Sequence, residues 1–217
     1  MATIALQMYT MRNFMGSKEQ VKDTLEKVAK IGYTKVQMSV PAFMTVEEVK
    51  EMLDACGLQA DSALAHSMKI DEEFDQIMHE AQVLGTHVIR LDGIPKELAQ
   101  TPEGFREYAA ILEKAGKRFH ELGYAMYYHF HAFEWVNFPD GQRGIDILLN
   151  ETTPEYVGFQ PDIYWLTSAG TEPSSSLRLF KGRARYMHVK DYGIKVRTGI
   201  LESVPRTFAS VGKGNLN

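Results

Sequence analysis

Apolar and polar positions along the chain follow two periods. Four segments place apolar residues at the three- and four-residue spacing of an amphipathic helix, then a glycine, then a short and mostly apolar run. The segments span residues 21–40, 46–66, 74–94 and 108–131, with the glycines Gly32, Gly57, Gly85 and Gly123. A glycine at a helix end can adopt the left-handed conformation that stops the helix and turns the chain back. Each segment therefore predicts a helix followed by a strand.

Three further apolar runs predict strands outside these segments, at residues 4–10, 156–162 and 184–191. Short strands that are apolar on both faces are typical of a parallel sheet covered by helices. No glycine-rich phosphate loop follows the first strand, which disfavours a doubly wound nucleotide-binding sheet. The chain therefore predicts an α/β fold, a single parallel (β/α) TIM-barrel domain over residues 1–217. Seven strands are recognisable, and the eighth is missing or incomplete at the C-terminal end.

Composition narrows the class of protein only a little. Apolar residues make up 44% of the 217 and charged residues 24%, with a net charge of −4. No block of Lys or Arg indicates a nucleic-acid partner, and no apolar run is long enough for a membrane span or a signal peptide. The lone Cys56 excludes an internal disulfide. We therefore expect a cytoplasmic protein with neither a nucleic-acid nor a membrane partner.

Chemically functional side chains gather where the predicted strands end. In a parallel barrel these strand ends meet at one rim. Side chains of this kind at the predicted rim include Gln37, His66, His129, His131, Glu134, Asp162, His188 and Lys190. Each also has an ordinary structural role: a histidine can bind a loop carbonyl, and Asp162 can cap a short helix beginning near Tyr164. Together, however, imidazole and carboxylate groups from successive strands suit a divalent metal such as Mn²⁺, Mg²⁺, Co²⁺ or Zn²⁺.

Three motifs at these strand ends resemble those of the xylose isomerase-like TIM barrels. This superfamily of sugar isomerases and epimerases includes the AP endonuclease 2-type barrel and endonuclease IV. The motifs are YHFHAFEW at 128–135, PDIYW at 161–165 and HVKDY at 188–192, and they follow one another on three consecutive predicted strands. The resemblance implies one divalent metal and chemistry at the carbon next to a carbonyl in a sugar or cyclic polyol.

The resemblance also implies roles for particular residues. Asp162 and His188 match two of the family's metal ligands, and we expect Glu134 to be the third, with His129 as the alternative. The expected catalytic residues are Glu134, His131 and Lys190. The expected substrate-binding residues are His66, His129, Trp165 and Gln37. Trp165 is included because its ring can stack on the apolar face of a sugar.

The sequence departs from the family pattern after the third motif. The closing segment SVGKGNLN stands where a last helix and an eighth strand would follow, so the Glu that the family takes from that strand is absent. An open barrel would leave strand edges unpaired, and a homo-oligomer is one way to cover them.

The function expected from these features is that of a metal-dependent sugar isomerase or epimerase. It would remove a proton next to a carbonyl and pass through an enediolate. Two alternatives stay open: a related dehydratase, which is a lyase, and a catalytically inactive sugar-binding barrel that lacks the eighth-strand ligand. An endonuclease IV-like nuclease is disfavoured, because three zinc ions need more ligands than the rim supplies and the net charge opposes DNA binding. The expected partner is a small-molecule sugar.

Overall fold

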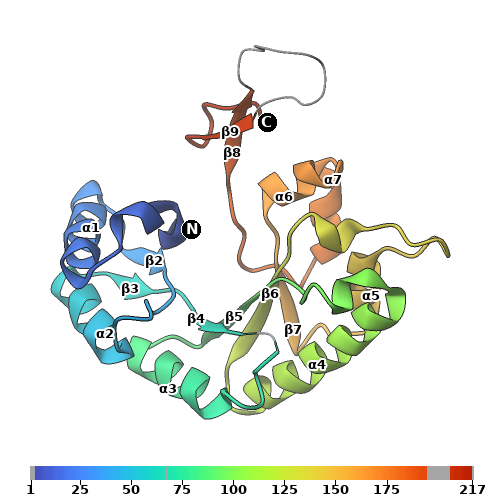
Figure 1. Cartoon of the computed structure of the whole chain (residues 1–217), viewed down its shortest axis with the longest axis horizontal. Helices are drawn as coiled ribbons and strands as arrows, with labels where there is room; N and C mark the ends of the chain where they lie inside the picture. Colours follow the sequence, from blue (N-terminus) through green and yellow to red (C-terminus); the bar gives the residue numbers. More distant parts are fainter. Residues whose placement is uncertain (1–2, 67, 195–205, 217) are drawn as a thin grey trace. The chain divides into compact units, whose positions relative to one another are not determined.

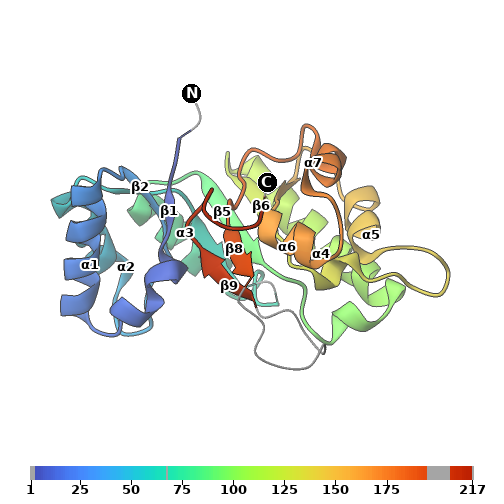
Figure 2. The same cartoon turned by 90° about the horizontal axis from the view of Figure 1, so that it is seen from above.

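The computed structural model describes residues 3–66, 68–194 and 206–216 and divides the chain into two compact units. The first unit comprises Met1–Leu91 and Phe119–Met126, and the second comprises Asp92–Arg118 and Tyr127–Asn217. Figures 1 and 2 show how helices and strands follow one another along the chain. Within the described ranges, no helix is long and apolar enough to cross a membrane. The expectation of a single domain stays a prediction.

Helices and strands alternate in the first unit, as the periodicity predicts. Its elements are β1 (Leu6–Gln7), η1 (Met8–Phe14), α1 (Lys18–Ile31), β2 (Lys35–Gln37), α2 (Val46–Ala55), β3 (Gln59–Ala60), β4 (Ala63–Ala65), α3 (Phe74–Leu84) and β5 (Val88–Asp92). The strands β1, β2 and β3 pair in parallel, with Val36 opposite both Leu6 and Ala60. The strand β4 pairs in parallel with β5, with Leu64 opposite Arg90. The run predicted as one strand at 58–66 is therefore two short strands with different partners.

The glycines expected to end the helices have the conformation that the prediction requires. Gly32 and Gly85 are the C-caps of α1 and α3, with φ of 111° and 71°. Gly57 and Gly123 follow the other two helices and also have positive φ. L-residues with a side chain adopt this conformation at a cost, whereas glycine does not. The helix ends predicted from sequence are thus confirmed.

The second unit is built around the strands β6 and β7. Its elements are η2 (Leu98–Gln100), α4 (Pro102–Glu121), β6 (Ala125–His129), η3 (Phe133–Trp135), α5 (Gly144–Asn150), β7 (Val157–Gln160), α6 (Ile163–Ser168), α7 (Pro173–Ser176), η4 (Leu177–Phe180), β8 (Asp191–Ile194) and β9 (Arg206–Ala209). The ends of α4 and β6 at 119–126 belong to the first unit. Along β6 and just beyond it, Tyr128 and Phe130 face the core. Tyr128 packs edge-on against Tyr108 at 5.6 Å, and Phe130 stacks on Phe180 at 5.1 Å between ring centres.

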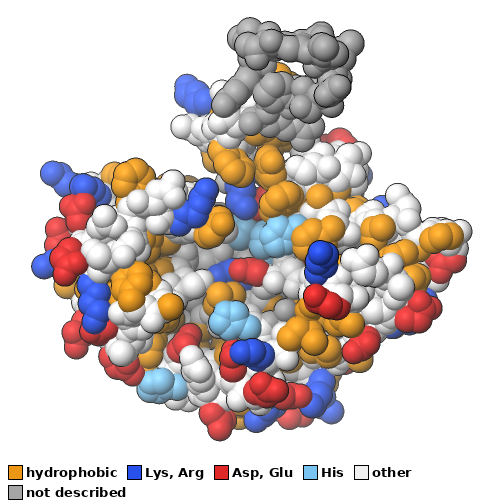
Figure 3. Space-filling view, viewed as in Figure 1, with side chains coloured by type: hydrophobic (Ala, Val, Ile, Leu, Met, Phe, Trp, Pro, Cys, Tyr) orange, Lys and Arg blue, Asp and Glu red, His pale blue; other side chains and the backbone are white. Residues whose placement is uncertain are grey.

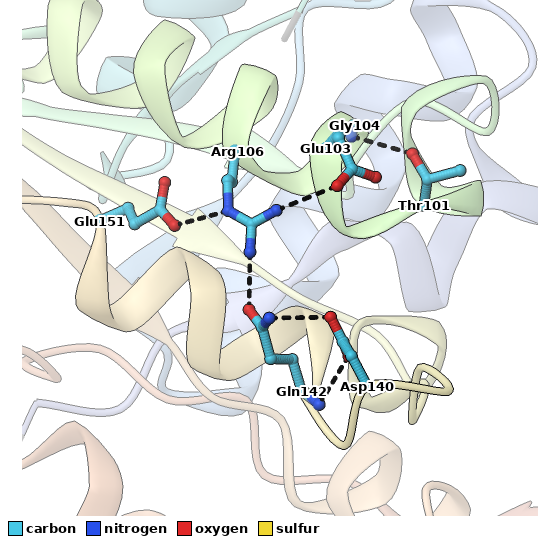
Figure 4. A network of polar contacts seen from close by, with 7 residues as sticks. All are labelled: Thr101, Glu103, Gly104, Arg106, Asp140, Gln142 and Glu151. Atoms are coloured by element: carbon cyan, nitrogen blue, oxygen red, sulfur yellow. Dashed lines mark hydrogen bonds and ion pairs between the residues drawn. The ribbon is translucent and has the colours of Figure 1, made fainter.

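A surface network of polar contacts ties α4 to α5 and to the loop that precedes α5. Thr101 caps α4 by accepting a hydrogen bond from the Gly104 N–H at 3.1 Å. One turn later, the Arg106 guanidinium donates to Glu103, Glu151 and Gln142 (Figure 4). The Gln142 side chain is itself held by Asp140. The contacts hold the chain on either side of α5 in place within the second unit.

The last predicted strand, at 184–191, differs from expectation. Its pairing within 184–190 is a single parallel bridge between His188 and Asp162. The strand β8 begins at Asp191 and pairs antiparallel with β9, with Asp191 opposite Ala209. A carboxylate at this point explains the break, because Asp191 accepts backbone hydrogen bonds from Tyr192 and from the turn at 212–216. The hairpin of β8 and β9 was not predicted from the sequence.

Candidate metal centre

His129 is the buried histidine at the end of β6, and only 3% of it is exposed. Its Nδ1 lies 3.1 Å from the backbone carbonyl of Gln160, an acceptor, so Nδ1 carries the hydrogen and Nε2 keeps a lone pair. Burial first, and then the neighbouring His188, lower the pKa of His129 to about 3. The ring is therefore neutral at pH 7 and can act as a ligand.

Asp162 follows β7 and is fully buried, and its two oxygens have different partners. The Oδ1 atom accepts hydrogen bonds from the backbone N–H groups of Tyr164 and Trp165, at 2.9 and 3.4 Å. Asp162 therefore caps α6, as one of its two expected roles requires. The Oδ2 atom lies 2.6 Å from Lys190 Nζ and 3.5 Å from His188 Nδ1. Burial opposes ionisation, but His188 and Lys190 outweigh it and lower the pKa of this carboxyl group.

Backbone pairing places His188 beside Asp162. The His188 N–H donates to the carbonyl of Pro161 at 2.8 Å, and the Ile163 N–H donates to the carbonyl of His188 at 3.2 Å. These two bonds form the parallel bridge between His188 and Asp162. The His188 ring also packs against the His129 ring, with centres 4.4 Å apart. Three residues from separate parts of the sequence thus come together.

His129, Asp162 and His188 form a group that fits a divalent metal ion. Each offers one ligand atom, all these atoms lie within 4.8 Å of one another, and all three residues are buried. Two imidazole nitrogens and one carboxylate oxygen are a donor set that proteins use for Zn²⁺, Mn²⁺ and Co²⁺. The Gln160 carbonyl fixes the His129 tautomer, as second partners of metal-binding histidines commonly do. The chemistry of the donors therefore agrees with the implied metal.

Glu134, the ligand favoured from the sequence, is not a member of this group in the described part of the chain. It lies in η3 and is fully buried. Its Oε1 accepts a hydrogen bond from the Tyr128 hydroxyl at 2.5 Å, and its Oε2 accepts one from the His131 N–H at 2.8 Å. Burial raises the pKa of Glu134 to about 7. Tyr128 was not predicted as the partner of Glu134, because an aromatic residue in an apolar strand is typical of the core.

His131 and Lys190 lie near the proposed metal ligands, and both have aromatic neighbours. The His131 ring stacks on Phe133 and meets Trp165 edge-on, with centres 5.3 and 5.0 Å apart. Its Nδ1 is buried, with no hydrogen-bond partner among residues 3–66, 68–194 and 206–216. Burial lowers the pKa of His131. Lys190 Nζ lies 6.0 Å from the centre of the Trp165 ring. The space-filling view shows histidine side chains beside hydrophobic and basic ones on one face of the molecule (Figure 3).

Gln37 and His66, expected to bind substrate, lie in the first unit. His66 is exposed, with Nδ1 3.1 Å from the carboxylate of Glu73. Gln37 is buried and donates a hydrogen bond to Asp61 at 3.1 Å. Both residues thus have local partners, and their roles in substrate binding stay predictions.

The sequence matches the family model of the xylose isomerase-like TIM barrels over residues 25–217. The match covers most of the chain, so the protein belongs to this family. It also confirms the predicted fold class, an α/β barrel with parallel strands. No curated protein matches the sequence.

Solved structures of similar fold have low sequence identity to this chain. A sugar phosphate isomerase/epimerase from Parabacteroides distasonis ATCC 8503 has a TM-score of 0.74 and 20% identity, with 92% of this chain and 79% of that chain covered. The probable 3-DHS dehydratase AsbF of Bacillus anthracis, involved in petrobactin synthesis, has a TM-score of 0.73 and 15% identity, with 100% and 86% covered. A xylose isomerase-like TIM barrel protein from Mycobacterium smegmatis, in complex with magnesium, has a TM-score of 0.66 and 14% identity, with 99% and 84% covered.

Proposed function

We propose that this protein is a metal-dependent isomerase or epimerase that moves a proton at the carbon next to a carbonyl in a sugar or cyclic polyol. The observation that carries the proposal is the convergence of His129, Asp162 and His188, in a chain of the xylose isomerase-like family. The neighbour from P. distasonis, named as a sugar phosphate isomerase/epimerase, supports the same class of reaction.

The proposed metal ligands are His129, Asp162 and His188. In this set His129, on β6, takes the place of Glu134, the ligand favoured from the sequence. Glu134 is a poorer ligand in this arrangement, because both of its oxygens already accept hydrogen bonds and a metal would have to displace one. Two nitrogen donors favour Zn²⁺, Co²⁺ or Mn²⁺ over Mg²⁺, which prefers oxygen. A divalent ion held there supplies Lewis acidity that makes the proton next to a carbonyl easier to remove.

The residues around the donors would handle the proton and the charge. His131 has a buried ring nitrogen without a partner in the described residues, so it is placed to accept and return a proton. Lys190 carries the positive charge that can stabilise an oxygen becoming negative. Trp165 presents a half-buried ring that can pack on the apolar face of a sugar.

Glu134 would act through His131 instead of on the substrate. Its carboxylate holds the His131 N–H and the Tyr128 hydroxyl, so it fixes the backbone that carries the proposed base. We therefore assign it a positioning role within the catalytic set expected from the sequence.

Solvent exchange tests the proposed reaction. The protein, loaded with Zn²⁺, Mn²⁺ or Co²⁺, is incubated in D₂O with a panel of keto- and aldo-sugars and cyclic polyols. Deuterium at the carbon next to the carbonyl supports proton transfer, and loss of this exchange in Asp162→Asn and His131→Gln assigns it to the site. Substrate binding without any exchange by the loaded protein would contradict the proposal and favour the inactive sugar-binding barrel.

A dehydratase is the second function with a specific observation in its favour, the fold similarity to the B. anthracis protein. Elimination of a β-hydroxyl begins with the same proton removal, so exchange alone does not separate the two. The mass of the product does, because dehydration removes one water and isomerisation removes nothing. The sugar substrate, the cytoplasmic location, the absence of nucleic-acid and membrane partners, and the homo-oligomer stay predictions from the sequence.

A further inference from the structure

The ammonium group of Lys190 lies next to Asp162 Oδ2, the oxygen that we propose as the metal ligand. Its Nζ is 2.6 Å from Asp162 Oδ2, the atom that also lies 3.5 Å from His188 Nδ1. We propose that Lys190 is an internal cation that takes the place of the metal, and that metal binding displaces its ammonium group from Asp162. This inference rests on the proposed metal centre.

The first reason for this proposal is that the two oxygens of Asp162 have different partners. Oδ1 accepts two backbone hydrogen bonds at the start of α6, whereas Oδ2 is the atom near His188. Asp162 is fully buried, and a buried carboxylate needs a cation or several donors nearby. In the structure the ammonium of Lys190 meets this need. A metal bound to the same oxygen would meet it equally well.

The two cations exclude each other at this oxygen. A metal ion binds a carboxylate oxygen at about 2.0–2.2 Å, and the Lys190 ammonium already lies 2.6 Å from this oxygen. A divalent ion and an ammonium group side by side also repel each other strongly in a site of low polarity. The free energy of metal binding is therefore reduced by the cost of moving Lys190 away.

The Lys190 side chain can move away from Asp162. It is 21% exposed and has a flexible four-carbon stem, and its Nζ is already 6.0 Å from the centre of the Trp165 ring. A lysine ammonium over a tryptophan ring is stabilised by a cation–π interaction. Displacement would therefore turn Lys190 from the partner of Asp162 into a free positive charge beside the sugar-packing ring. The metal and this charge would become available to the substrate together.

Metal affinity of Lys190→Met is the direct test. The substitution removes the charge and keeps a side chain of similar length, and the dissociation constant for Zn²⁺ or Mn²⁺ is measured by competition with a chromogenic chelator. We expect Lys190→Met to bind about tenfold more tightly than the wild type. Lys190→Arg keeps the charge and should stay near the wild type. Lys181→Met, which removes an exposed lysine of the same unit, should leave the affinity unchanged.

Two further measurements complete the test. Added metal should change the fluorescence of Trp165 in the wild type and give no such change in Lys190→Met. Trp165→Phe is the control, because any change that remains in this variant comes from Trp135. Lys190→Met should also be less stable than the wild type without metal and gain more in melting temperature when metal is added. If Lys190→Met does not fold without metal, Lys190→Gln takes its place, because an amide still donates to Asp162 but competes less.

The outcomes separate this inference from the metal centre itself. If the wild type binds metal and Lys190→Met binds it equally or more weakly, the inference is overturned and the metal centre stands. If neither protein binds metal, the centre is overturned and the inference with it. Loss of binding in Asp162→Asn shows that the ion measured is the one at this site.

Discussion

Among single residues, Asp162 has two oxygens with different partners. Oδ1 caps α6, and Oδ2 lies beside His188 and Lys190. This division predicts different results for two substitutions. Asp162→Asn keeps an oxygen that can cap α6 but loses the negative charge, whereas Asp162→Ala loses both. We expect both variants to lose metal binding. The free energy of unfolding of Asp162→Ala should be about 1 kcal/mol lower than that of Asp162→Asn, because alanine cannot cap α6. Isothermal titration with Zn²⁺ and urea denaturation in the presence of a chelator measure the two effects. Unimpaired metal binding by Asp162→Asn would contradict the assignment.

The ionisation of Glu134 predicts a pH dependence of stability. Its pKa in the folded protein, about 7, lies above the ordinary value of 4.5, so the folded state holds the proton more tightly than the unfolded state. The stabilisation from this group is therefore complete below the unfolded pKa and is lost as the pH rises through the folded pKa. The loss amounts to about 3 kcal/mol at most.

Glu134→Gln removes this dependence, because the amide does not titrate. We expect the free energy of unfolding of the wild type to fall, relative to that of Glu134→Gln, as the pH rises from 4.5 to 7. Urea denaturation of both proteins across this range measures the difference. A difference that does not vary with pH would contradict a buried, titrating carboxyl group.

At the scale of elements, β7 depends on a glycine for close packing. A Cβ atom at Gly158 would lie 2.4 Å from the Tyr127 ring and 3.1 Å from the carbonyl of Arg183. We expect Gly158→Ala to lower the free energy of unfolding by about 1–3 kcal/mol, as overpacking does in protein cores. Gly193→Ala, on β8, is the matched control, because its Cβ would meet the Thr207 side chain at an ordinary 3.9 Å. Equal stability of the two variants would show that β7 has more room than the structure indicates.

The β8 strand and the turn that follows β9 are joined by the carboxylate of Asp191. It accepts backbone hydrogen bonds from Tyr192, Gly212, Gly214 and Leu216, at 2.8–3.1 Å. We expect Asp191→Ala to speed amide hydrogen exchange at the residues of the turn, because their N–H groups lose their acceptor. Asp191→Asn, with one oxygen left, should have a smaller effect. Exchange in the turn that neither variant alters would contradict this role.

At the scale of the whole molecule, metal binding should be visible as stability. A ligand that binds only the folded state stabilises it by about 2.7 kcal/mol at a concentration one hundred times its dissociation constant. We therefore expect Zn²⁺ or Mn²⁺ to raise the melting temperature, and a chelator to reverse the rise. Asp162→Ala should show no such response. A rise of equal size in that variant would place the bound metal elsewhere in the chain.

The order of helices and strands could be predicted because it depends on local patterns. Apolar spacing marks the helices, and a glycine such as Gly85 marks where each one ends. Pairing between distant segments could not be predicted in the same way. The antiparallel contact of β8 with β9, and the reduction of the strand at 184–191 to one bridge, depend on which backbone groups meet after folding. Nothing in the period of apolar residues contains that information.

Sequence alone was enough to predict the fold class, the family motifs and two of the proposed metal ligands, Asp162 and His188. Each of these follows from residue type and local order. The groups that lie beside these residues could not be predicted, because the partners of a buried polar group depend on the direction of its side chain in the folded protein. Tyr128 and the His131 backbone occupy the oxygens of Glu134, whereas His129 lies beside His188. Tertiary packing also brought Lys190 onto Asp162, because a buried carboxylate needs a cation and this one lay within reach.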